Sequence, residues 1–353
     1  MDTDILIANV IVPSIKVLVV LGVLSLAVAY LTLLERKVLA FIQLRLAPRR
    51  VGPHGIFQPF ADVLKLLLKE DVVPDRADRK LFILAPIIAI VPAFAALAVI
   101  PFAGEPFTIF GYQIQPWISD VNIGILYILS ISSLGVYGIM LGGWASNSKY
   151  PLLGALRSAA QMVSYEVPLG LAIVGPLMVA GTASMSGIVR AQQGMGVWFF
   201  LPQIVALLCY FISGVAETNR LPFDLPEAEA ELVAGFQTEY SGMKWAFFFL
   251  AEYTNMIVVS SIAATLWFGG WLRPFPGVKA LEFLNFFNFI SPALSGVFWF
   301  CLKVFLILYT YIWIRGTFPR YRYDQLMRLG WKWLLPISLA NVVITGLVLV
   351  IAR

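Results

Sequence analysis

Six of the twenty carboxylates of the chain lie in one stretch, positions 217–239, which has Arg220 as its only basic residue. The acids are Glu217, Asp224, Glu227, Glu229, Glu231 and Glu239. Carboxylates crowded together repel one another when ionised, and partial burial adds to this effect, so their pKa values rise and they titrate as a coupled set. We therefore expect this stretch to take up and release protons as a unit.

The elements that position this stretch are expected to be membrane helices. Of the 353 residues, 60% are hydrophobic and only 13% are charged, and the mean hydropathy is +0.85, far above the range of soluble domains. Apolar runs of about 20 residues predict an all-α polytopic membrane protein with about eight transmembrane helices, forming a single membrane domain over residues 1–353. The expected spans are 11–34, 81–102, 121–142, 161–181, 197–216, 245–271, 291–314 and 333–352.

The distribution of Lys and Arg predicts the orientation of these spans. Nineteen basic residues fall in the connections on one side and four on the other, and the richer side is cytoplasmic by the positive-inside rule. The acidic loop 217–244 is therefore expected in the cytoplasm and both termini outside. The net charge of +5 reflects this topology and requires no nucleic-acid partner. The N-terminus lacks the basic region and cleavage site of a signal peptide, so we expect it to be retained.

The chain offers few ligands for a cofactor. Its two cysteines, Cys209 and Cys301, each stand alone inside a span, and His54 is the only histidine. It contains no GxGxxG or Walker A pattern. We therefore expect no metal ion, iron-sulfur cluster, haem, flavin or nucleotide to be bound by this chain.

An amphipathic helix is expected at the cytoplasmic surface over residues 55–70. Gln58, Asp62, Lys65 and Lys69 recur at steps of four, three and four, which places them on one stripe of a helix, and apolar residues fill the other faces. The segment is too short and too charged to span, so it should lie on the membrane. It is either a surface anchor or the wall of an opening for a lipid-soluble molecule.

Three glutamates are expected within or at the ends of spans, on the same cytoplasmic half as the acidic loop. Glu35 ends the first span in a mixed charge cluster that could be a simple interfacial anchor. Glu166 lies about a turn inside the fourth span, and Glu252 about seven residues inside the sixth, roughly 10 Å deep. An unpaired carboxylate there costs several kcal/mol, so it must be protonated, paired or hydrated. Together with the acidic loop, these glutamates are expected to form one group of acids that extends from the cytoplasmic surface toward the bilayer centre.

Lys303 is the one basic residue predicted near the middle of a span, twelve residues before Arg315. At that depth a lysine is expected to face a carboxylate or a water-filled cavity. No internal repeat is visible, which argues against a secondary transporter built from repeats.

Five segments resemble, in the same order, the H subunit family of proton-pumping NADH-quinone oxidoreductases, respiratory complex I. They are LLERKVLAFIQLR, RRVGPHGIFQPFADVLKLLLKED, GWASNSKYPLLGALRSAAQMVSYE, ETNRLPFDLPEAEAELVAGFQTEYSG and RYRYDQLMRLGWK. The resemblance implies an eight-helix subunit of the bacterial inner membrane, at the heel of the membrane arm, which encloses much of the quinone access chamber.

The resemblance also implies roles for particular residues. The quinone passage would be lined by Arg36, Phe60, Asp62, Lys65 and Arg315. The link from quinone to proton path would be Glu35, Glu166, Glu217, Asp224, Glu227, Glu229, Glu231 and Glu252, to which we add Lys303. The simpler interpretation is that the loop acids contact basic partner subunits.

The implied partners are the peripheral subunits at the quinone site and the small and antiporter-like membrane subunits. Quinone is the substrate, and FMN and iron-sulfur clusters belong to partner subunits. The chain itself would be an enzyme subunit without a redox centre, inactive alone.

The sequence departs from the family at two positions of this site. Ser133 stands where some members have Glu, which puts a proton path through that helix in doubt, and Gln237 stands where His is often found. Two other functions remain open. One is the homologous membrane subunit of a hydrogenase or formate-hydrogenlyase complex, and the other is a stand-alone ion carrier that uses Glu166 and Glu252.

Overall fold

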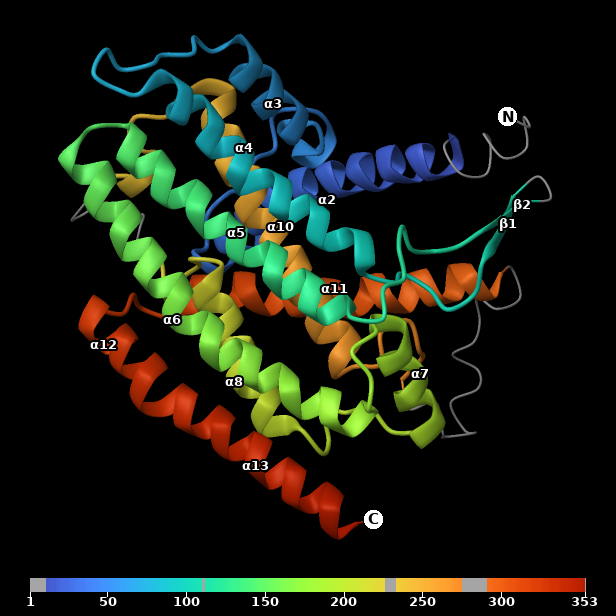
Figure 1. Ribbon diagram of the computed structural model, residues 1–353. Helices are drawn as coiled ribbons and strands as arrows, with labels where there is room; N and C mark the ends of the chain where they lie inside the picture. Colours follow the sequence, from blue (N-terminus) through green and yellow to red (C-terminus); the bar gives the residue numbers. More distant parts are fainter. Residues whose placement is uncertain (1–10, 110–111, 226–232, 275–290, 353) are drawn as a thin grey trace, which may run out of the picture.

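The computed structural model describes residues 11–109, 112–225, 233–274 and 291–352 (Figure 1). Within these ranges it has seven helices long and apolar enough to cross a membrane. The all-α polytopic class is therefore confirmed. The seven are α2 Val12–Ile42, α4 Arg79–Ala96, α5 Gly124–Ala145, α6 Lys149–Ala180, α10 Gly242–Leu266, α11 Pro292–Thr317, and a last helix built from α12 Tyr323–Arg328, a π turn Leu329–Leu334 and α13 Leu335–Ile351.

The fifth expected span is shorter than its hydropathy suggested. Residues 197–216 were expected to form one helix, but α8 runs only from Ile204 to Glu217. Its 14 residues cover about 21 Å, less than the roughly 30 Å of a bilayer core. The preceding apolar residues form turns, in which Phe200 N donates to Trp267 O at 3.0 Å. These residues are apolar although they are not helical, because they pack against the end of α10.

Two other helices are longer than the expected spans. α2 continues to Ile42, and α6 begins at Lys149. The charged cluster at Glu35 and Arg36 is therefore helical, so the two side chains, adjacent in sequence, point in directions about 100° apart. The sequence expectation stopped at the first charged residue, although a helix can extend beyond the membrane core.

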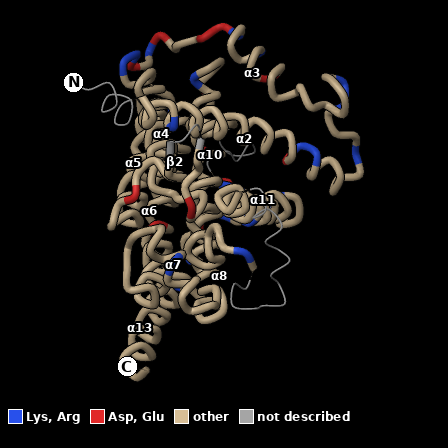
Figure 2. Tube along the Cα trace, turned by 90° about the vertical axis from the view of Figure 1, so that its right-hand side faces the viewer, with Lys and Arg blue, Asp and Glu red and all other residues tan. Residues whose placement is uncertain are grey.

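The connections divide between two ends of the bundle (Figure 1). One end carries α3 Gln58–Leu68, the 3-10 turn Gly235–Gln237 and α12, and we call it the α3 end. The other, the α7 end, carries the helix α7 Met185–Met195 and a small antiparallel pair, β1 Phe107–Ile109 and β2 Tyr112–Ile114. Figure 2 shows charged residues concentrated on the long connection around α3.

Close packing of α4 on α5 depends on small residues. A Cβ at Gly138 of α5 would lie 2.5 Å from the backbone nitrogen of Ala89 in α4. Glycine allows the two backbones to approach in this way, as is common between membrane helices. α10 is the most enclosed of the long helices, with 61% of its most apolar window buried, so side chains on it face the interior of the bundle.

Candidate functional site

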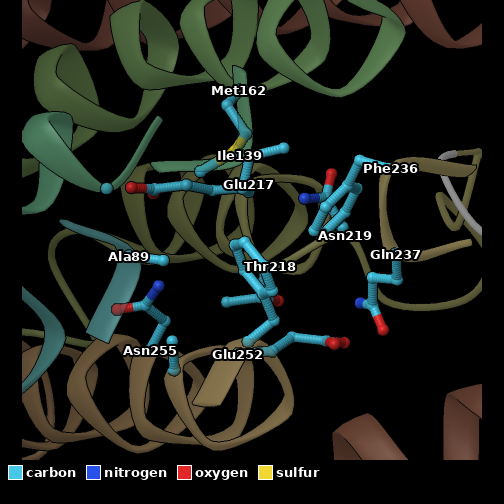
Figure 3. Close-up of a pocket in the computed structure, with 13 residues that line it drawn as sticks. Ala89, Ile139, Met162, Glu217, Thr218, Asn219, Phe236, Gln237, Glu252 and Asn255 are labelled. Carbon is cyan, nitrogen blue, oxygen red and sulfur yellow. The ribbon is translucent and has the colours of Figure 1, made fainter. Parts of the chain in front are cut away.

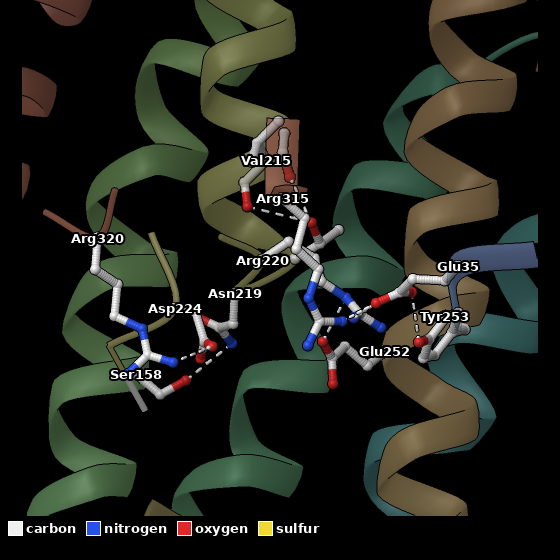
Figure 4. A network of polar contacts seen from close by, with 12 residues as sticks. Glu35, Ser158, Val215, Asn219, Arg220, Asp224, Glu252, Tyr253, Arg315 and Arg320 are labelled. Atoms are coloured by element: carbon white, nitrogen blue, oxygen red, sulfur yellow. Dashed lines mark hydrogen bonds and ion pairs between the residues drawn. The ribbon is translucent and has the colours of Figure 1, made fainter. Parts of the chain in front are cut away.

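A buried ion cluster joins four elements near the α3 end. Arg220, just after α8, lies with its Nε 2.7 Å from Glu252 Oε1 and its Nη1 3.5 Å from Glu35 Oε1. Arg315 of α11 also pairs with Glu35, and the Tyr253 hydroxyl donates to Glu35 Oε2 at 2.6 Å. Figure 4 shows Arg220 lying between the two glutamates.

The cluster is balanced in charge and largely shielded from water. The side chains of Glu35 and Arg220 are 5% and 7% exposed, and that of Glu252 is 18% exposed. Two guanidinium groups face two carboxylates, and the Arg220 guanidinium stacks over the Tyr253 ring at 4.0 Å. Because removal of one partner would leave a buried charge without compensation, each member holds the others in place.

The segment that carries Arg220 is fixed by an amide of α6. Gln161 Nε2 donates to the carbonyl oxygens of Ala216, at 2.7 Å, and Phe223, at 2.9 Å, so one side chain spans the turn after α8. The Phe223 ring also stacks on Tyr321, with ring centroids 5.5 Å apart. The two hydrogen bonds from Gln161 satisfy backbone carbonyl oxygens that would otherwise lack a donor inside an apolar bundle.

Asp224 lies on the same segment but belongs to a separate ion pair. Its Oδ2 lies 3.2 Å from Nη2 of Arg320, in the connection after α11. The Asp224 side chain is 7% exposed and that of Arg320 is 38% exposed. The acidic stretch is thus held to the connection 318–322 at the α3 end.

A cavity of about 40 Å³ separates Glu252 from Glu217. Asn255, Thr218 and Gln237 contribute polar groups to its lining, and Figure 3 shows Glu217 and Glu252 reaching it from different sides, with Thr218 between them. A cavity of this volume and polarity has room for about two or three water molecules. Water in this first cavity can therefore connect the two carboxylates.

A second cavity, of about 20 Å³, adjoins the first. Glu217, Thr218 and Asn255 line both of them, and Ser132 of α5 lines only the second. Glu217 therefore borders two small cavities in succession, each lined by a few polar groups among apolar side chains. The second has room for about one water molecule.

Glu166 of α6 contacts α5 directly. The Ser133 hydroxyl lies within hydrogen-bond distance of Glu166 Oε1 and, at 2.8 Å, of the carbonyl oxygen of Leu129. Ser133 stands where some members of the family that the sequence resembles have Glu, and its hydroxyl contacts the Glu166 carboxylate. Both side chains are half-buried.

The residues assigned to the quinone passage divide between two places. Arg36 and Asp62 form an ion pair of 2.7 Å between α2 and α3, which Gln58 extends through a bond of 3.0 Å to Asp62. Phe60, two residues before Asp62, packs edge-on against Tyr30 of α2, with centroids 6.4 Å apart. Arg315 is instead part of the buried ion cluster.

Lys65 follows Asp62 by three residues and lies on the same helix. Much of the apolar surface of α3 is uncovered, including Leu64, Leu67 and Leu68. The helix expected over 55–70 therefore presents apolar residues beside a charged stripe, an arrangement that suits the surface of a membrane.

Among the residues that the structure describes, no carboxylate is paired with Lys303. Its Nζ donates to the carbonyl oxygens of Gly270, at 2.8 Å, and Leu272, and lies 4.5 Å from the centre of the Trp198 ring. Within the described residues, the acceptors of Lys303 are thus backbone carbonyl oxygens of the irregular turns that follow α10.

Tyr240, near the end of the acidic loop 217–244, contacts α4 and α5. Its ring stacks on Phe82, with centroids 4.0 Å apart, and its hydroxyl lies within hydrogen-bond distance of the carbonyl oxygens of Phe82 and Gly142. Burial raises the pKa of this phenol, which therefore stays protonated and can donate to one or the other oxygen.

Three of the predicted site residues, Glu227, Glu229 and Glu231, lie outside the described residues. Other residues of the site were not expected there from the sequence, among them Arg220, Tyr253, Asn255 and Ser132. Two signals were available: Arg220 is the only base among six acids, and Asn255 follows Glu252 by three residues, which places them on one helix face.

Comparison of the sequence with known proteins identifies the family of the chain. The family described as NADH dehydrogenase matches residues 15–346, almost the whole chain. The chain belongs to this family. It is 53% identical over 341 residues to the H subunit of the NADH-quinone oxidoreductase of Burkholderia vietnamiensis, covering 94% of this chain and 90% of the relative.

Two further relatives carry the same description. The NADH-quinone oxidoreductase H subunit of Burkholderia ambifaria is 53% identical, and the first H subunit of the corresponding enzyme of Koribacter versatilis is 48% identical. Each alignment covers 94% of this chain and 90% of the relative. The resemblance in the five segments is thereby confirmed, and the chain is a membrane subunit of the NADH-quinone oxidoreductase type.

Proposed function

We propose that this chain encloses part of the quinone passage of a proton-translocating NADH-quinone oxidoreductase and links quinone reduction to proton movement. The observation that carries the proposal is the position of Arg220. It pairs with Glu35, the neighbour in sequence of the passage residue Arg36, and with Glu252, which lines the first cavity. One side chain therefore connects the charges near the passage with the chain of carboxylates.

The chemistry follows from the charge of reduced quinone. Reduction by two electrons requires two protons, and until they arrive the quinone carries negative charge. An anion held near Arg36 or Arg315 competes with Glu35 and Asp62 for these guanidinium groups. At about 4 Å such interactions are worth roughly 1–4 kcal/mol for effective dielectric constants between bulk water and 20, which is enough to change the proton occupancy of a neighbouring carboxylate.

The carboxylates then form a sequence of proton sites. From the ion cluster the order is Glu252, the first cavity, Glu217 and the second cavity, and then Glu166, which contacts Ser133 beside that cavity's Ser132. Glu166 is half-buried between α5 and α6, and Val163 and Val167 beside it are exposed. Since a carboxylate is unfavourable against lipid, this face suits contact with a neighbouring membrane subunit.

The rest of the assembly follows from the same proposal. FMN and iron-sulfur clusters belong to partner subunits, so electrons reach quinone from outside this chain, which is inactive alone. The α3 end faces the cytoplasm of a bacterial inner membrane, as the excess of basic residues there predicts. Apolar residues of α3 guide the quinone tail, which binds by buried area at about 25 cal/mol per Å².

The proposal is tested with Glu217→Gln in the assembled complex, with Glu105→Gln, an exposed glutamate in the connection after α4, as control. Inner membranes are assayed for NADH oxidation with a short-chain quinone and with ferricyanide, and assembly is checked on a native gel. We expect the quinone rate of Glu217→Gln to fall at least about tenfold, as for loss of a positioned proton donor, while ferricyanide reduction persists. Wild-type quinone reduction and proton pumping in an assembled variant would refute the link.

A further inference from the structure

Two consecutive serines of α5 lie between Glu217 and Glu166. Ser132 lines the second cavity together with Glu217, whereas Ser133 contacts Glu166. No hydrogen bond joins the two carboxylates directly within the described part of the chain. The two serines thus connect the cavity that Glu217 borders with Glu166, from neighbouring positions of α5.

The hydrogen bonds of Ser133 can take two arrangements. Its single hydroxyl proton has two acceptors in reach, the carbonyl oxygen of Leu129 at 2.8 Å and Glu166 Oε1. If Glu166 is ionised, Ser133 donates to it. If Glu166 is protonated, the carboxyl group donates to Ser133 Oγ, and Ser133 turns to Leu129. Each arrangement thus fits one protonation state of Glu166.

The hydroxyl of Ser132 is held by the same carbonyl. Ser132 Oγ donates to Leu129 O at 3.0 Å, so both serine hydroxyls lie within hydrogen-bond distance of one oxygen atom. One of them borders the cavity of Glu217 and the other meets Glu166. A water molecule in the second cavity has Ser132 and Glu217 as polar neighbours.

We propose that Ser132 and Ser133 form a hydroxyl relay that carries a proton between Glu217 and Glu166. Glu217 gives its proton to Ser132 or to a water molecule of the second cavity, and that carrier passes a proton to the oxygen of Ser133. The O–H bond of Ser133 breaks at the same time and its proton passes to the ionised Glu166. Both serines are neutral before and after the step, and nothing is oxidised. This inference rests on the proposed function, because it specifies one step of the proton path.

A purely structural role predicts different behaviour. Serine and threonine in membrane helices commonly bond to a carbonyl three or four residues earlier, and this bond contributes little to helix stability. Alanine would then replace either serine without loss of turnover. A relay, in contrast, requires the hydroxyl at position 133, and Thr retains it whereas Ala does not.

The test uses the assembled complex in proteoliposomes, with Ser133→Ala, Ser132→Ala and Ser133→Thr. The control is Ser130→Ala, on an exposed face of the same helix. We expect quinone reduction by Ser133→Ala to fall about tenfold, below the roughly 10²–10⁴-fold of a lost general acid or base, because water partly replaces a hydroxyl. Ser132→Ala should be slowed less, and Ser133→Thr and Ser130→Ala should match the wild type.

A second readout is the rate ratio in H2O and D2O, which a structural role does not change. It should rise in Ser133→Ala, because proton transfer becomes slower, and return to the wild-type ratio in Ser133→Thr. Wild-type turnover and isotope ratio in Ser133→Ala would overturn the relay. Glu217→Gln and Glu166→Gln are measured in parallel. If they are slow while Ser133→Ala is normal, the relay alone fails, and if all are normal, the proposed proton path fails too.

Discussion

Arg220 Nε lies 2.7 Å from Glu252 Oε1, so the only base of the acidic stretch is paired with a glutamate of α10. Arg220→Gln would leave both Glu35 and Glu252 without this partner. Breaking a buried ion pair from one side typically costs about 3–5 kcal/mol, so we expect a marked loss of assembled complex on native gels. Adding Glu252→Gln should recover assembly but not quinone reduction. Arg190→Gln, an exposed arginine of α7, is the control. Normal assembly of the single variant would contradict the cluster.

The surface ion pair between Arg36 and Asp62 should affect quinone binding more than stability. Its side chains are 49% and 25% exposed, and such pairs contribute about 0–1 kcal/mol to stability. Asp62→Asn should therefore assemble normally but raise the KM for a long-chain quinone several-fold, with kcat nearly unchanged. Asp75→Asn, an exposed acid on the same connection, should leave KM unchanged. Equal KM values for both variants would remove Asp62 from the passage.

Lys303 is expected to stabilise the fold rather than to move protons. Lys303→Met would leave the carbonyl oxygens of Gly270 and Leu272 without their donor, at a cost of about 1–3 kcal/mol. The variant should lower the midpoint of thermal inactivation while the protons pumped per NADH stay constant. Lys16→Met, which changes a lysine near the start of α2, is a suitable comparison. A changed pumping ratio would restore Lys303 to the proton path.

Packing of α4 on α5 should not tolerate a side chain at position 138. In Gly138→Ala the added Cβ meets the backbone of Ala89 at 2.5–2.7 Å, which no rotamer change relieves. We expect a reduced amount of complex and a cost on the order of 1–3 kcal/mol, typical of overpacking. Gly170→Ala, where nothing lies within 4 Å of the added Cβ, should behave as the wild type. Similar yields of both variants would argue against close backbone contact.

Hydropathy predicted the positions of the long helices because each buries an apolar sequence of sufficient length. It could not predict that α8 begins only at Ile204, since the turns before it are equally apolar. It also ended the first span at Glu35, although the helix continues. Hydropathy thus indicates which segments face lipid or the protein interior, but it does not indicate at which residue a helix begins or ends.

The sequence predicted those site residues that stand out only by their depth inside a membrane span. Glu166 and Glu252 were identified because a carboxylate inside a span needs a partner or water. The identity of that partner depends on tertiary structure: Arg220 reaches Glu252 from another segment, and Ser133 reaches Glu166 from another helix. The partners of Lys303 were missed because they are carbonyls of an irregular turn, in which Gly270 has a φ of 51°.

The shortness of α8 has an electrical consequence. The helix begins beside the end of α10, where Phe200 N meets Trp267 O, and it is roughly 21 Å long. If this start marks the outer edge of a 30 Å layer, Glu217 lies about two thirds of the way across, and a proton that reaches it from the α3 end would cross about one third of the transmembrane voltage. At about 2.3 kcal/mol per charge per 100 mV, the field shifts the occupancy of Glu217 by on the order of 1 kcal/mol. An energised membrane would thus act on this carboxylate directly.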